Sequence, residues 1–108
     1  MSSTTLTRGN SRETFYISSI FNTSPVPPSG SIVQTFSVPG LQTTDLISVI
    51  GVTGSQGAGV VIVEADCFTA NVISVRFGNY TQMPAIPTLG AYILEITRIE
   101  GPLPTNAV

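Results

Sequence analysis

The amino-acid sequence predicts an all-β protein, an antiparallel β-sandwich with jelly-roll-like connections. Ile, Val and Thr supply one third of the 108 residues, and their β-branched side chains favour strands over helices. Lys is absent from the sequence, so the strong helix formers are few. Ten glycines and eight prolines provide turns along the chain. Short strands between closely spaced turn signals are typical of sandwiches.

Alternating side chains predict three strands in the first half of the chain, at residues 13–21, 31–38 and 45–53. In the first strand, Phe15 and Ile17 point to one face and Tyr16 and Ile20 to the other. The third strand is apolar on both faces, so we expect it at the centre of its sheet. The Pro-rich residues 22–30 predict an extended connector between the first two strands.

Three more strands are predicted at residues 59–68, 72–77 and 91–99. In the first of these, alternation places Val61, Val63, Ala65 and Cys67 on one face of the strand. It places Val60, Ile62, Glu64 and Asp66 on the opposite face. In the other two, the apolar side chains that share a face are Ile73, Val75 and Phe77, and Tyr92, Leu94 and Ile96. Residues 69–71 predict a tight hairpin turn in which Asn71 adopts a positive φ.

The two ends of the chain lack this alternation. Residues 1–12 are rich in Ser and Thr, and we interpret them as an N-terminal arm that is flexible or ordered by a partner. The sandwich domain is expected at residues 13–101. Residues 102–108 form a short C-terminal tail, whose prolines prevent it from extending a central strand.

Residue usage excludes several classes of function. The sequence has no His and one Cys, which excludes a His/Cys zinc site, Ser-His-Asp or Cys-His catalysis, and an internal disulfide. A formal net charge of −2 with four scattered Arg residues argues against nucleic acid as a partner. No apolar run reaches the roughly 18 residues of a membrane helix. We therefore expect a non-enzymatic protein with no cofactor, metal or membrane partner.

The chain has little charge with which to cover its own surface. Charged residues make up 9% of the sequence, against about 25% in an ordinary soluble domain, and the mean hydropathy is +0.36. We therefore expect part of the outer surface to be buried against other copies of the chain.

Glu64, Asp66 and Arg76 are the candidate functional residues within the predicted strands. Paired carboxylates can serve acid–base chemistry or bind Ca²⁺. The competing interpretation is an acidic pair at the surface or in an interface, neutralised by Arg76 on the adjoining strand. Ca²⁺ needs six or more oxygens and no third acid is near in the sequence, which favours the second interpretation. Arg76 then pairs across the strands or contacts another subunit.

A resemblance adds to these inferences. Residues 36–99 resemble a small structural domain of phage virion and fibre proteins, through a run of short motifs. The motifs are Val38-Pro39-Gly40, Asp45-Leu46-Ile47, Ala65 followed by Ala70-Asn71-Val72, Val75-Arg76-Phe77, Asn79-Tyr80-Thr81 and Gly90-Ala91-Tyr92. Similar domains occur in head decoration (cement) proteins, head fibres and tail appendages, and nothing in their pattern is catalytic.

The resemblance implies a virion protein that is made in the host cytoplasm and decorates the capsid surface. We expect a homotrimer whose partner is the major capsid protein. The expected capsid contacts are arm residues, namely Thr4, Thr5, Leu6, Arg8 and Arg12. The alternative is a tail or fibre component with a carbohydrate- or receptor-binding module, for which Tyr80 and residues 82–89 are the candidates.

Overall fold

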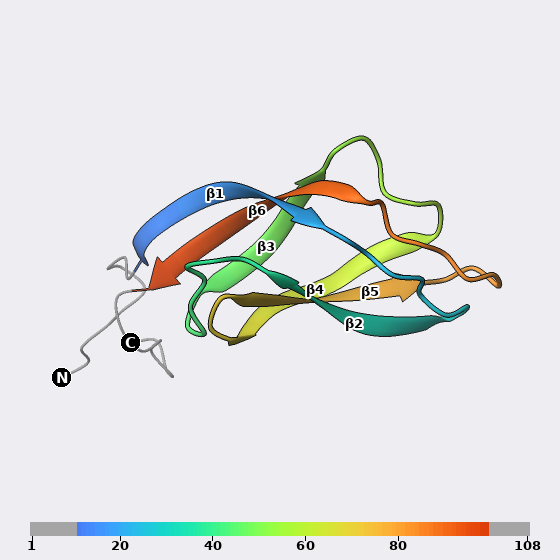
Figure 1. Cartoon of the computed structure of the whole chain (residues 1–108), viewed down its shortest axis with the longest axis horizontal. Helices are drawn as coiled ribbons and strands as arrows, with labels where there is room; N and C mark the ends of the chain where they lie inside the picture. Colours follow the sequence, from blue (N-terminus) through green and yellow to red (C-terminus); the bar gives the residue numbers. More distant parts are fainter. Residues whose placement is uncertain (1–10, 100–108) are drawn as a thin grey trace, which may run out of the picture.

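The computed structural model describes residues 11–99, with side chains from residue 13 onward, and this part of the chain is all-β (Figure 1). It contains six strands and no helix. The strands are β1 (Ser11–Phe21), β2 (Gly30–Ser37), β3 (Leu46–Val52), β4 (Val60–Thr69), β5 (Val72–Asn79) and β6 (Gly90–Ile99). The predicted all-β class is therefore confirmed, and the strands lie close to the predicted ranges.

The strands form two antiparallel sheets of three strands each, which lie as two layers in Figure 1. The strand order is β1-β6-β3 in one sheet and β2-β5-β4 in the other. Only β4 and β5 are both sequence neighbours and sheet neighbours. Every other pairing joins distant segments, and β1 pairs with β6 so that Ser11 lies opposite Ile99. The described chain therefore starts and ends at the same end of one sheet.

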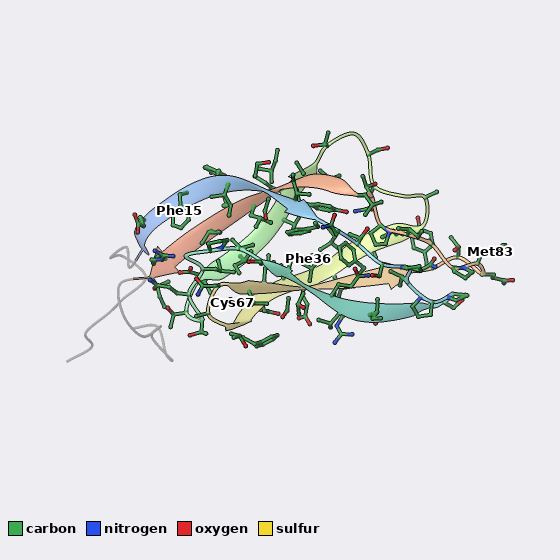
Figure 2. All side chains as sticks on the ribbon, viewed as in Figure 1. Phe15, Phe36, Cys67 and Met83 are labelled. Carbon is green, nitrogen blue, oxygen red and sulfur yellow. The ribbon has the colours of Figure 1, made fainter. Side chains whose placement is uncertain are left out.

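Four aromatic rings in mutual contact join the two sheets in the core. Phe21 and Tyr92 belong to the β1-β6-β3 sheet, and Phe36 and Phe77 belong to the other. The rings of Phe21 and Phe36 stack with centroids 4.1 Å apart, and Phe77 meets Tyr92 edge-on at 6.3 Å. Each such pair contributes about 0.5–1.5 kcal/mol beyond the area it buries. Phe36 lies between the layers in Figure 2, where it holds them face to face.

The central strands of the two sheets supply the remaining core. On β5 and β6 every second side chain is fully buried, and these side chains are Ile73, Val75, Phe77, Tyr92, Leu94 and Ile96. The sequence alternation predicts these faces correctly, because both strands keep an unbroken period of two.

The predicted faces of β4 are wrong at its N-terminal half. Val60 and Ile62 point into the core, whereas the alternation places them on the same face as Glu64 and Asp66. The pairing register shifts between Ile62 and Glu64, so that Val63 is an extra residue in the ladder. A bulge of this kind turns two successive side chains to one face, and the two faces of β4 exchange at Val63.

The prediction that residues 45–53 form a central strand is also wrong. β3 lies at the edge of its sheet, with β6 as its only ladder partner among the described residues. Its apolar side chains lie on both faces because Leu46 and Ile50 are exposed. A second register shift, between Val49 and Gly51, makes Ile50 a bulged residue.

The predicted turn after β4 is confirmed. Asn71 has a φ of 70°, and its side-chain oxygen accepts a 2.8 Å hydrogen bond from the backbone N–H of Gly40. Its own backbone N–H donates to the carbonyl of Leu41 at 2.9 Å. The β4–β5 hairpin therefore also holds the loop between β2 and β3 in place.

Candidate interaction surface

The three charged residues singled out from the sequence lie on the outer face of the β2-β5-β4 sheet. The register places Glu64 opposite Arg76 and Asp66 opposite Ser74. Arg76 Nε lies 3.4 Å from Glu64 Oε1, and a second guanidinium nitrogen donates to the Ser31 hydroxyl at 3.2 Å. Both charged side chains are well exposed, at 38% for Arg76 and 55% for Glu64.

This arrangement provides a cross-strand ion pair with little capacity for chemistry. An exposed pair of this geometry contributes at most about 1 kcal/mol to stability. Residues 11–99 contain no group of three or more acidic, Cys or His side chains placed to hold a metal ion. Glu64 remains open to a second cationic partner because its side chain is more than half exposed.

The expected capsid contacts lie outside the part of the chain whose side chains are described. Thr4, Thr5, Leu6 and Arg8 precede residue 11, and of Arg12 only the backbone is described. β1 begins at Ser11, so the last two residues of the expected arm belong to the sheet. The arm therefore joins the domain at a fixed point, where Ser11 pairs with Ile99.

Arg98 and Asp45 form a buried ion pair that the sequence does not reveal. The Arg98 guanidinium donates two hydrogen bonds of 2.9 Å, one to each oxygen of Asp45. The Asp45 side chain is fully buried and that of Arg98 is 15% exposed. Asp45 also accepts from the backbone N–H of Gln42, and its hydrogen bond with Arg98 raises the pKa of the guanidinium. The pair fixes the β2–β3 loop to the end of β6.

Asn79 organises the loop between β5 and β6. Its buried amide donates to the carbonyls of Val26 and Met83, at 3.2 and 2.8 Å, and accepts from both the N–H and the hydroxyl of Thr81. A two-way backbone bridge between Val26 and Ala85 holds the same loop. The loop is therefore tied to the domain, although it lies at the opposite end of the molecule from Phe15, as Met83 shows in Figure 2.

The three tyrosines do not form a common platform. The hydroxyl of Tyr16 donates to Glu95 at 3.0 Å, and this bond raises the pKa of Tyr16. Tyr92 is buried in the core, where its hydroxyl donates to the carbonyl of Thr88 at 2.6 Å and burial raises its pKa. Only Tyr80 stands free on the surface, next to the buried Asn79.

Large apolar side chains are exposed over much of the described surface. Fourteen large apolar residues between positions 13 and 99 are more than a third exposed, and many of them lie on the outer sheet faces and in the β5–β6 loop. On the outer face of the β1-β6-β3 sheet, Ile20, Ile50 and Ile93 extend across all three strands. On the other sheet, Val33, Val61 and Val63 surround Gly78 and the ion pair. A surface of this kind is typical of proteins that bury it against a partner.

A groove runs along the seam where the edge strands β3 and β4 face each other, and it is apolar at one end and more polar at the other. At one end it is lined by residues 49–52 and 60–62. It continues along residues 47–49 and 62–65, where it reaches Glu64. No backbone ladder joins β3 to β4 in the described chain, so the two sheets remain open along this side.

Comparison with protein-family models, with curated proteins and with solved structures found no match to this chain. None of the secondary structure between residues 11 and 99 is a helix capable of crossing a membrane.

Proposed function

We propose that this chain is a non-enzymatic structural protein of a bacteriophage particle, which decorates or cements the capsid surface as a homotrimer. The observation that carries the proposal is the exposed apolar surface on the outer faces of both sheets. A rigid domain with so few charges needs partners to cover it. The resemblance of residues 36–99 to phage structural domains supports the same conclusion.

Jelly-roll wiring of a β-sandwich is part of this proposal. β1 pairs with β6 and β2 pairs with β5, which is the pattern of a long hairpin that rolls up so that its outermost strands meet. The connections from β1 to β2, β2 to β3, β3 to β4 and β5 to β6 each change sheet. This arrangement supports a fold of the class that viral structural proteins use as a rigid body.

In the proposed mechanism the domain supplies rigidity and the arm supplies attachment. Ser11 and Ile99 lie side by side, so the arm leaves the domain at the end distant from the β5–β6 loop. The arm, with Thr4, Thr5, Leu6, Arg8 and Arg12, lies across neighbouring subunits of the capsid surface, including the major capsid protein, and locks them together. Many weak contacts multiplied by symmetry produce high avidity.

Deletion of residues 1–10 tests this mechanism, because it removes the arm and leaves β1 whole. We expect the shortened chain to fold, with an unchanged β-sheet circular dichroism spectrum, and to lose co-sedimentation with capsids. The full chain is the control, and isolated tails are the control particle. Undiminished binding of the shortened chain to capsids would remove the arm from the mechanism.

A second candidate function is a tail or fibre component that binds a carbohydrate or receptor. The observation that favours it is Tyr80, which is 73% exposed on a loop that Asn79 holds rigid. Exposed aromatic rings on fixed loops are suitable contacts for sugars. A glycan-array signal that disappears in Tyr80→Ala, with co-sedimentation on tails instead of capsids, would favour this candidate over the first.

A further inference from the structure

The seam between β3 and β4 has the properties of a site for an extended peptide strand. Both strands are edges of their sheets, and their backbones are not joined to each other by a ladder. The groove between them follows about six residues of each strand, a length of about 20 Å. An unpaired edge beside a groove that is apolar at one end and polar at the other offers main-chain hydrogen bonds and side-chain contacts to an added strand.

Two bulges lie along this seam, one on each strand. Ile50 is bulged on β3 and Val63 is bulged on β4. Both aliphatic side chains are turned outward and are more than half exposed. They lie among the residues that line the groove, Ile50 at one end and Val63 at the other. The bulges therefore give the groove an aliphatic rim.

The seam lacks the charged side chains and prolines that protect many edge strands. Natural edges carry charged side chains or proline that prevent pairing with another chain. Residues 46–52 of β3 and residues 60–63 of β4 contain neither. The first charge on β4 is Glu64, which lines the end of the groove next to Ile47 and Ser48. The suitable occupant is an uncharged, β-branched strand with one cation at its end.

We propose that residues 4–8 of a second copy of this chain occupy the seam as a strand added beside β3. In an extended strand Thr4, Leu6 and Arg8 share one face. Leu6 then lies against the aliphatic rim at Val63. Arg8, about 7 Å further along, meets the exposed carboxylate of Glu64. The three threonines of this segment, at positions 4, 5 and 7, are β-branched and suit a strand.

The same chain's arm is not the occupant in this register. Arg8 is three residues from Ser11, a separation that spans at most about 11 Å. A strand beside the free edge of β3 lies three strand spacings from β1, or about 14 Å. The backbone of Arg8 therefore does not reach the seam of its own domain, whereas the arm of a neighbouring copy has no such restriction.

This inference rests on one part of the proposed function, the assembly of several copies of the chain. It identifies a second copy of the chain as one of the subunits that the arm contacts. A disulfide cross-link tests it. In a Cys67→Ser background, a tagged chain with Leu6→Cys is mixed with an untagged chain with Val63→Cys and mildly oxidised. We expect a disulfide-linked heterodimer of tagged and untagged chains on a non-reducing gel, several-fold stronger than in the control.

The control replaces Val63→Cys with Tyr16→Cys. Tyr16 is as exposed as Val63, at 61% against 57%, but it lies on the outer face of the other sheet. A heterodimer band no stronger than in the control would overturn the inference. An intrachain disulfide in a dilute chain that carries both cysteines would also overturn it, because it would place the arm on its own domain.

A charge exchange provides a second measurement that does not depend on cysteine chemistry. Arg8→Glu should lower the solution mass of the assembly, and its combination with Glu64→Arg should restore it. Light scattering and capsid co-sedimentation on the same variants separate the two proposals. A trimer that binds capsids but forms no cross-link contradicts only the inference that the arm occupies the seam. A cross-linked assembly that does not co-sediment with capsids contradicts only the proposed function.

Discussion

Individual residues determine how the loops of this protein are held, and the buried pair of Asp45 and Arg98 is the clearest case. The two residues are 53 positions apart in the chain. They meet because β6 brings Arg98 to the end of the sheet beside the β2–β3 loop. A pair at this separation leaves no periodic signal in the sequence. The same is true of Asn79, whose partners Val26 and Met83 become visible only when the loops are packed.

Asp45→Asn should destabilise the protein much more than a substitution in the exposed ion pair. It removes the carboxylate that accepts two hydrogen bonds from the guanidinium of Arg98, which is 15% exposed, and leaves the half-exposed Glu13 at 3.8 Å as a weaker counter-charge. Breaking a buried pair costs about 3–5 kcal/mol. Glu64→Gln is the matched control, with an expected loss below about 1 kcal/mol. Urea unfolding measures both. Equal losses for the two variants would contradict a structural role for the Asp45–Arg98 pair.

At the scale of strands, the sequence predicts the buried side chains correctly where the alternation is regular and incorrectly where a bulge interrupts it. β5 and β6 keep strict alternation, so the sequence identifies their buried side chains. β4 contains the same residue types, but the extra residue at Val63 exchanges its faces. Bulges depend on the register with a partner strand, which a single sequence does not contain. The apolar pattern of β3 leads to a wrong prediction for a related reason. In the sequence, exposed apolar side chains on an edge strand cannot be distinguished from side chains that are buried on both faces of a central strand.

Two glycines in the loop between β3 and β4 provide a matched test of a close packing contact. Gly54 and Gly59 have nearly the same positive φ, 78° and 80°. A Cβ at Gly54 would meet nothing, whereas one at Gly59 would collide with the Thr81 side chain. Thr81 cannot turn away without losing its hydrogen bonds to Asn79 and Met83.

Gly54→Ala should therefore cost about 1–2 kcal/mol, the penalty for a left-handed residue. Gly59→Ala should cost the same amount plus about 1–3 kcal/mol for the overpacking. Thermal and urea unfolding of the two variants give the difference directly. If the two alanine variants are equally stable, the contact between residue 59 and Thr81 does not restrain the loop.

At the scale of the molecule, the low charge and the exposed apolar faces predict an assembly. We expect light scattering of the purified chain to give about 34 kDa, three times the 11.3 kDa of one chain. In the proposed homotrimer, the three copies bury outer sheet faces that a single copy leaves in water. A mass of one chain at all concentrations would contradict the homotrimer. The apolar surface would then be covered by a different protein.

The sequence predicts the class of the fold better than its wiring. Composition and alternation are local properties, and they identify six strands. Which strands become neighbours depends on contacts between residues such as Phe21 and Phe36, or Thr14 and Thr97, that lie far apart in the chain. The candidate surface also has a local part and a non-local part. Glu64 and Arg76 can be identified from the sequence because they are charges in apolar strands. The seam cannot, because it forms only when two edge strands from different sheets face each other.

The pairing of the first strand with the last also has a consequence for folding. Among the strands of residues 11–99, the β4–β5 hairpin, closed by Ala70 and Asn71, is the one sheet contact that a growing chain can make locally. Both β1 and β3 pair with β6, so these two ladders of the described sheet cannot form until β6 leaves the ribosome. Such non-local contacts fold slowly, on a scale of about milliseconds to seconds. Until β6 is synthesised, the aliphatic edge of β3 stays unpaired. We expect the nascent chain to be most prone to aggregation in this interval.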